Sequence, residues 1–350
     1  MRLSAYDHAP GEHCGSTSLR NLSNFYGWGH DEPTCFGLAS GLGFTFFAGE
    51  EAPERTFFGR PLWLEGAFFE NLGISHSHTQ GEDWEAAWAS MTGALDGGDP
   101  VMVFTDIYHL DYYDTDTHFA PHSLLLVGYD ETVPAREAGA TDPDAGDGIV
   151  YCADSEFETV QRLPLASLRA AMSSKATIPL SNRYLVVEGD PTVDRTTAAR
   201  EAARETATYM LDPDEAARGV PEWGAHGVPG IRALGNDIAE WTALSDPHWT
   251  VRFAYQNIER RGTGGACFRT LYTGFLDEVG AEIGLVGFAD EMYDIEGVWH
   301  RIADLLSEAS ETEEVFDLPG YLSKSSNLFS TLADREERFY REVLATLPDV

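Results

Sequence analysis

The chain has 350 residues, of which 43% are hydrophobic and 12% aromatic, so it can build one large core or, as we expect, two domains. This composition excludes an intrinsically disordered protein, although the formal net charge is -35. Acidic residues number 58 against 23 basic ones, and of the basic residues only Lys175 and Lys324 are lysine. We expect no nucleic-acid binding, because no basic patch is present to neutralise phosphates. A surface so rich in carboxylates is typical of proteins that work in concentrated salt, which indicates an extreme halophile as the source.

No apolar segment follows a basic start, and no stretch approaches the ~20 apolar residues of a membrane span, so we expect a cytoplasmic protein that does not bind membranes. His76 and His78 would project to one side of a strand, but no further ligand-type cluster stands nearby. Neither a disulfide scaffold nor a zinc site is indicated, since the cysteines lack CxxC spacing: Cys14, Cys35, Cys152 and Cys267. We expect no metal and no cofactor.

The first predicted element is a helix over residues 14–26, where apolar residues recur every three to four positions before Gly27. Cys14 therefore lies at the helix N-terminus, where unpaired N–H groups and the helix dipole favour the thiolate, which is the nucleophilic form. Gly15 allows a substrate to approach the backbone closely. The alternative is that Cys14 is a small buried apolar residue, as most free cysteines are.

Glycines and aromatic residues are interspersed in the next segment, residues 34–47. We interpret it as a buried segment packed under the first helix, and the alternative is a channel for an acyl chain or a pantetheine arm. A second helix is predicted at 83–95. Strands are predicted at 101–107, 123–129, 148–153 and 183–188. A helix followed by an antiparallel sheet is typical of the α+β class.

Two polar residues flank a predicted pair of strands. His122 directly precedes the run 123–129, and Asp154 directly follows the run 148–153. In an antiparallel pair the start of the first strand lies beside the end of the second, so the two side chains become neighbours. A carboxylate in that place orients an imidazole and stabilises its charged form. With Cys14, these residues form a candidate thiol-nucleophile set in the order Cys, His, Asp.

The segment 111–121 leads directly into His122 and is the expected lid of the site. Tyr108, His109 and His118 in and beside this segment are candidate contacts to a substrate.

Beyond about residue 193 the strand signal disappears, and amphipathic patterns predict helices near 228–241, 268–279, 292–306 and 335–347. We therefore predict two domains, 1–192 and 193–350, of which the second is all-helical. The glycine-rich run 261–265 lacks a P-loop lysine and a preceding strand, so we interpret it as a helix-entry turn.

Several motifs carry a resemblance to a known family. HCGSTSLRNL, CFGLASGLGF, DIYHL, HFAPHSLLLVGYD and VYCADS, in this order, resemble the N-terminal domain of the butirosin biosynthesis protein H family. RGTGGACFRTLYTGFLDE resembles the helical domain that often follows it. The resemblance covers nearly the whole chain. It implies a papain-like fold, similar also to double-glycine leader peptidases.

The resemblance also implies roles for individual residues. Carried over by motif, Cys14 is the nucleophile, His122 the base and Asp154 the orienting acid. Papain-like enzymes place an oxyanion-stabilising glutamine about six positions before the cysteine, and here that position holds His8. Gly15 and Ser16, which follow the cysteine, are further candidates for oxyanion or substrate contacts.

The namesake of the family moves an aminoacyl group from a carrier-protein thioester to an aminoglycoside amine. We therefore expect a cysteine-dependent acyltransferase with a thioester donor, either an acyl carrier protein or coenzyme A, and a small amine as acceptor. The alternative is a papain-like peptidase or amidase that hydrolyses an amide or thioester with the same residues. A second alternative is a non-catalytic binding protein on the same fold. The oligomeric state stays open, a homo-oligomer included.

The charge of the chain generates a prediction about salt. Because the carboxylates repel one another, the thermal unfolding midpoint is expected to rise as KCl is increased from about 0.1 M to about 3 M. Circular dichroism measures this midpoint. A midpoint that stays constant or falls as salt is added would contradict the prediction.

Overall fold

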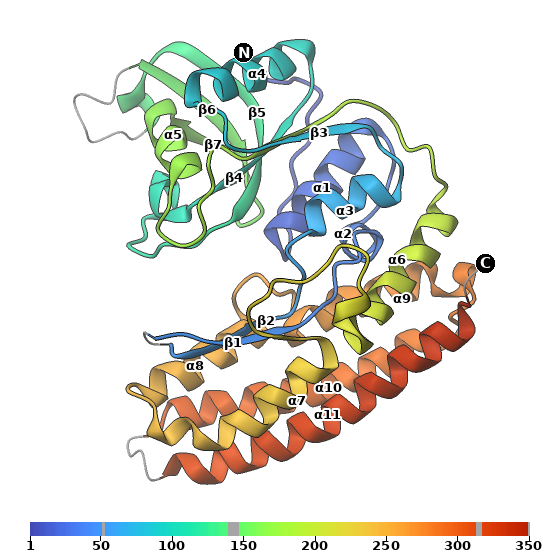
Figure 1. Ribbon diagram of the computed structural model, residues 1–350. Coiled ribbons are helices and arrows are strands. Elements are labelled where there is room, and N and C mark those ends of the chain that lie inside the picture. The colour runs from blue at the N-terminus through green and yellow to red at the C-terminus, as the bar shows by residue number, and fades with distance from the viewer. Residues whose placement is uncertain (51–52, 139–146, 313–316, 349–350) are drawn as a thin grey trace. The chain divides into compact units, whose positions relative to one another are not determined.

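The computed structural model describes residues 1–50, 53–138, 147–312 and 317–348 of the chain (Figure 1). The fold is α+β, with antiparallel sheets and a helical C-terminal region, as the sequence predicted. The chain forms two compact units, the first made of Met1–Glu32 and Gly73–Thr192 and the second of Pro33–Leu72 and Val193–Val350. The segment 33–72, which the sequence analysis assigned to the first domain, thus belongs to the same unit as the C-terminal helices.

The first unit begins with the helix α1 (Cys14–Tyr26), at the bounds predicted from the sequence. A six-stranded antiparallel sheet follows, in the spatial order β3-β8-β4-β5-β6-β7. Its strands are β3 (His76–Thr79), β4 (Val101–Thr105), β5 (His122–Pro134), β6 (Asp147–Ala153), β7 (Gln161–Pro164) and β8 (Tyr184–Val187). The helices α4 (Trp84–Gly97) and α5 (Leu165–Ser173) and the short 3-10 helices η1 (Ile107–His109), η2 (Asp111–Tyr113) and η3 (Ala135–Ala138) complete the unit.

Both faces of the central strands are covered. One face of β4, β5 and β6 packs with α4 and α5 into a hydrophobic core, and α1 packs against β5. Burial on both faces explains why the run Leu124–Val127 is apolar throughout rather than alternating. Each fully buried valine or leucine contributes roughly 1.5–3 kcal/mol relative to exposure, so this core holds the ends of β5 and β6 firmly in place.

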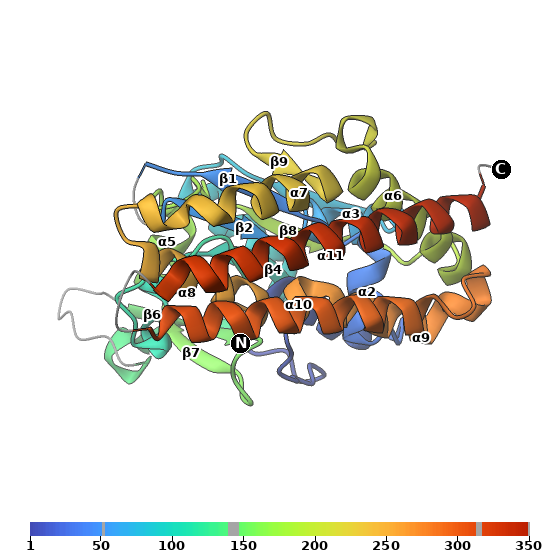
Figure 2. The ribbon, with the colours of Figure 1, turned by 90° about the horizontal axis from the view of Figure 1, so that it is seen from below.

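The second unit is mainly helical. Its elements in chain order are α2 (Glu32–Leu38), β1 (Thr45–Ala48), β2 (Arg55–Phe58), α3 (Leu64–Asn71), α6 (Arg195–Leu211), η4 (Pro213–Glu215), β9 (Ala225–His226), α7 (Gly227–Asp237), η5 (Ile238–Ala243), α8 (Pro247–Glu259), η6 (Ala266–Phe268), α9 (Arg269–Ile283), α10 (Phe288–Ser310) and α11 (Leu318–Thr346). The first residue of α2, Glu32, belongs to the first unit. Figure 2 shows α10 and α11 running side by side. Among the described residues, no helix has both the length and the apolar character needed to cross a membrane.

The strands of the second unit were not predicted. β1 pairs with β2 and also with the two-residue strand β9, which lies about 180 positions further along the chain. The preceding segment is buried as expected, and within its own unit it packs against α9. A side chain at Gly37 would collide with the ring of Phe275, so only glycine permits this approach.

A buried ion pair holds the helices of the second unit together. The Arg269 guanidinium donates to both carboxylate oxygens of Glu336, at 3.0 and 2.8 Å, and neither side chain has solvent exposure. The guanidinium carbon lies 4.8 Å from the centre of the Trp299 ring, whose indole N–H also donates to Glu336. Arg269 further donates to the carbonyl of Cys267 at 2.8 Å, within three consecutive residues of positive φ, 266–268. The pair therefore fixes the turn that enters α9.

Breaking this ion pair is predicted to be costly. Glu336→Ala leaves the Arg269 charge buried without its partner, so the free energy of unfolding should fall by about 3–5 kcal/mol. Chemical denaturation measures the change. Arg341→Ala is the matched control, because Arg341 pairs with the neighbouring Glu337 at the surface and should cost less than about 1 kcal/mol. Equal losses in the two variants would contradict the prediction.

Candidate active site

Cys14 is the first residue of α1, and His13 forms the N-cap of that helix. The His13 Nδ1 accepts the Ser16 N–H at 3.2 Å, and the His13 carbonyl accepts the Thr17 N–H at 2.8 Å. Two of the first-turn N–H groups are thereby satisfied within the helix. The N–H groups of Cys14 and Gly15 remain at the helix end, where no intrahelical acceptor exists.

His122 and Asp154 lie beside each other, as the antiparallel pairing of β5 and β6 requires. The His122 Nε2 is 2.9 Å from the Asp154 Oδ2, and the two side chains are 5% and 0% exposed. Interactions between His122 and the Cys14 sulfur lower the pKa of the thiol and raise that of the imidazole. Since Nε2 is engaged by the carboxylate, Nδ1 is the ring nitrogen left for the sulfur. The structure thus brings together the three residues that the sequence singled out.

Two tyrosines complete the surroundings of Asp154. The Tyr112 hydroxyl donates to Oδ2 at 2.9 Å and the Tyr113 hydroxyl to Oδ1 at 3.0 Å. The Glu156 N–H donates to Oδ1 at 3.3 Å. The buried carboxylate therefore accepts four hydrogen bonds, counting that of His122. Neither tyrosine was predicted from the sequence as a site residue, although both lie within the segment 111–121 that leads into His122.

The electrostatics of the site favour a negative Cys14, a positive His122 and a negative Asp154. Burial raises the pKa of the Cys14 thiol, but the neighbouring rings of His13 and His122 outweigh it and hold that pKa well below its usual range. Burial lowers the pKa of His122, but Asp154 and Cys14 overcome this and raise it well above its usual range. For Asp154, burial is outweighed by His122 and the hydroxyl donors, so its pKa is lowered. All three directions favour the charged forms: the thiolate, the imidazolium and the carboxylate.

The two tyrosines remain proton donors in this setting. Burial and the charge of Asp154 raise the pKa of Tyr112 and of Tyr113 far above neutrality. Their hydroxyls therefore stabilise the ionised form of Asp154 without competing for its charge.

His8 is tethered to the segment that follows Asp154. Its Nε2 donates to the Phe157 carbonyl at 2.7 Å, and the nearby Gly11 N–H donates to the Ser155 carbonyl at 3.0 Å. The His8 Nδ1 is buried and has no protein partner. Because Nε2 holds the proton in the neutral ring, Nδ1 is an acceptor and donates to an oxyanion only when the ring is protonated. Ser16, in contrast, directs its hydroxyl at the carboxylate of Glu32, at 2.8 Å.

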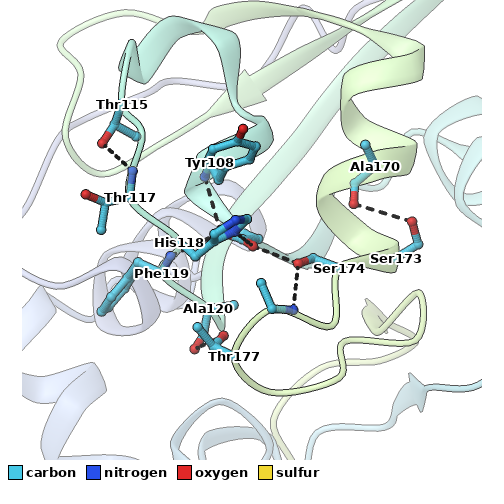
Figure 3. A network of polar contacts seen from close by, with 12 residues as sticks. Tyr108, Thr115, Thr117, His118, Phe119, Ala120, Ala170, Ser173, Ser174 and Thr177 are labelled. Carbon is cyan, nitrogen blue, oxygen red and sulfur yellow. Dashed lines mark hydrogen bonds and ion pairs between the residues drawn. The ribbon is translucent and has the colours of Figure 1, made fainter. Parts of the chain in front are cut away.

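The remaining candidates lie around a second buried carboxylate, that of Asp106. Figure 3 shows Tyr108 and His118 close together in this network. The Asp106 carboxylate accepts from His118 Nδ1 and Ser174 Oγ, both at 2.7 Å, and from two backbone N–H groups, those of Tyr108 and Phe119. The Tyr108 ring stacks on His118 with centres 4.1 Å apart, and His109 packs edge-on against Tyr108. None of the hydrogen bonds described for these side chains reaches Cys14, His122 or Asp154.

The expected lid is consequently fastened at two places. Its first part is bonded to Asp154 through Tyr112 and Tyr113, and its last part to Asp106 through His118 and Phe119. This segment supports the carboxylate and the strand that begins at His122. Within the described residues, no group of three or more histidine, cysteine or acidic side chains has an arrangement suited to a metal ion.

Cys14 at the N-terminus of α1, with His122 and Asp154 on the antiparallel sheet of the same unit, is the arrangement that the sequence analysis expected of a thiol-nucleophile set. Residues 13–134 match the family described as butirosin biosynthesis protein H, N-terminal, and residues 166–343 match the domain of unknown function DUF4872. The second match spans half of the chain, which therefore belongs to the DUF4872 family and carries a butirosin biosynthesis protein H N-terminal domain before it. No curated protein matches the chain. Cys14 and His122 lie inside the first match, and Asp154 lies between the two.

The lowered thiol pKa generates a prediction. Cys14 should react with iodoacetamide at about pH 6, because the pKa of its thiol lies below the usual thiol range. His122→Ala should raise the pKa of the Cys14 thiol and slow the reaction at about pH 6 by at least about tenfold. Peptide mass spectrometry against pH measures the modified fraction.

The other cysteines are internal controls. All three are buried, and burial raises the pKa of Cys152 and, to about 12, that of Cys267. Cys35 is buried within α2. Modification of these residues at the same rate as Cys14, or an unchanged profile in His122→Ala, would contradict the prediction.

Proposed function

We propose that the protein is a cysteine-dependent acyltransferase, which accepts an acyl or aminoacyl group on Cys14 from a thioester and passes it to an amine. The observation that carries the proposal is the 2.9 Å contact of His122 with Asp154, together with the interaction of His122 with Cys14 that lowers the pKa of the thiol and raises that of the imidazole. The match to the butirosin biosynthesis protein H N-terminal domain supports the same conclusion. An acyl carrier protein or coenzyme A is the proposed donor, and a small amine is the proposed acceptor.

The first half-reaction loads the enzyme. The Cys14 thiolate attacks the thioester carbonyl, and the N–H groups of Cys14 and Gly15 bind the oxyanion that forms. When this intermediate collapses, the bond to the donor sulfur breaks. The departing thiolate takes the proton from the His122 imidazolium, which leaves a neutral imidazole and an acyl group on Cys14.

The second half-reaction transfers the group. An amine attacks the Cys14 thioester and gives a proton to the neutral His122, and the carbon–sulfur bond then breaks to release the amide. Cys14 returns as a thiolate beside the imidazolium. Asp154 stays ionised throughout, holding the ring by Nε2 and stabilising its positive charge. Water in place of the amine would give a peptidase, amidase or thioesterase.

Intact mass spectrometry tests the proposal. The protein is incubated in molar KCl with acyl-coenzyme A and with acyl N-acetylcysteamine thioesters, and wild type is expected to gain one acyl group. Cys14→Ala should gain none, and His122→Ala should load at least about a hundredfold more slowly. Addition of a small primary amine should then discharge the adduct and yield the amide.

Three results separate the candidate functions. Discharge by the amine with little loss in buffer alone supports a transferase, whereas rapid loss in buffer supports a hydrolase. If folded wild type forms no adduct and Cys14 shows no selective reactivity, the proposal fails, and a binding protein on the same fold becomes the better explanation.

A further inference from the structure

Glu32, the first residue of α2, directs its carboxylate at the segment around Cys14. The side chain is buried, and residues 12 and 13 donate their backbone N–H groups to it at 3.0–3.2 Å. The hydroxyls of Ser16 and Thr17 donate to the same carboxylate at 2.8 and 2.9 Å. Glu32 thus contacts the chain on both sides of Cys14, before the helix and within its first turn.

The two carboxylate oxygens are used unequally. Oε1 accepts from the His13 N–H, the Ser16 hydroxyl and the Thr17 hydroxyl, and it shares the Glu12 N–H with Oε2. The fit is close, since a side chain at Gly11 would come within 2.3 Å of Glu32 Oε2. Oε1 therefore accepts most of the hydrogen bonds that connect Glu32 to the segment around Cys14.

The negative charge of Glu32 does not help to form the nucleophile. A negative group at the N-terminus of α1 offsets the positive end of the helix dipole, and it would disfavour a thiolate at Cys14. The carboxylate instead holds the backbone around Cys14 in place. By holding the His13 N–H and the hydroxyls of the first turn, it fixes the cap and hence the direction in which Cys14 leaves the backbone.

We propose that Glu32 is a positioning residue for the nucleophile: it locks the turn 12–17 so that the Cys14 sulfur faces His122. This rests on the proposed function only for its effect on turnover, because the orientation of the sulfur is measurable without any substrate.

Two substitutions separate geometry from charge. Glu32→Gln keeps an oxygen at the Oε1 position and removes the charge, whereas Glu32→Ala removes every contact. We expect Glu32→Ala to raise the Cys14 thiol pKa, read from the pH profile of iodoacetamide alkylation, and to lower the acyl-loading rate by about a hundredfold. Glu32→Gln should remain within about threefold of wild type, with a thiol pKa equal to or below that of wild type.

Glu296→Ala is the matched control. Glu296 is also buried and accepts the hydroxyls of two threonines, Thr270 and Thr273, in the second unit. Its loss should lower stability and leave the alkylation profile unchanged. Circular dichroism establishes that each variant is folded, and if Glu32→Ala is not, Glu32→Asp withdraws the carboxylate by one methylene and carries the same test.

Either of two results overturns the proposal. A folded Glu32→Ala or Glu32→Asp protein with the wild-type alkylation profile would show that Glu32 only stabilises the fold. Equal impairment in Glu32→Gln and Glu32→Ala would show that the oxygen position which glutamine retains is not what Glu32 contributes. Failure of wild type to accept an acyl group would refute the proposed function alone, since the alkylation profiles would still decide the role of Glu32.

Discussion

The hydrogen bond between His122 and Asp154 is the interaction on which the rest of the site depends. A carboxylate without solvent exposure is costly to desolvate, and the structure offsets that cost with four donors. Two of these donors are tyrosines from η2, so the segment between β4 and β5 is organised by the same charge that orients the imidazole. Removing the carboxylate would leave an imidazolium and two hydroxyls facing an empty position, which is why this network has to be complete.

Much of the site could be predicted from the sequence, because the relevant signals are local. Three-to-four-residue periodicity located α1, and two short apolar runs located the strands that bring His122 to Asp154. Tyr112, Tyr113 and Glu32 escaped prediction for a common reason. Each acts through a hydrogen bond to a residue at least 15 positions away, and no periodicity records such a contact.

The division of the chain into two units also depends on contacts between residues far apart in the sequence, which no local pattern records. The sequence predicted the amphipathic C-terminal helices, but β1 finds its partner β9 about 180 positions later, and the glycine at position 37 is explained only by a ring on α9. Composition does not indicate that residues 33–72 belong to the same unit as the C-terminal helices. Arg269 is a similar case, since an arginine inside an apolar helix pattern gives no indication that a glutamate 67 positions away neutralises it.

The segment 111–121 is bonded to two buried carboxylates, to Asp154 near its start and to Asp106 near its end. For its backbone to open fully, both sets of bonds must break, and Asp154 would lose two of the donors that hold it beside the imidazole. The segment and the imidazole therefore belong to one cooperative unit, in which local fraying is suppressed. A surface connection of this kind would ordinarily exchange its amide hydrogens quickly, but here protection at Tyr108 and Phe119 should approach that of the sheet itself, so that hydrogen exchange in a loop reports on the integrity of the reactive centre.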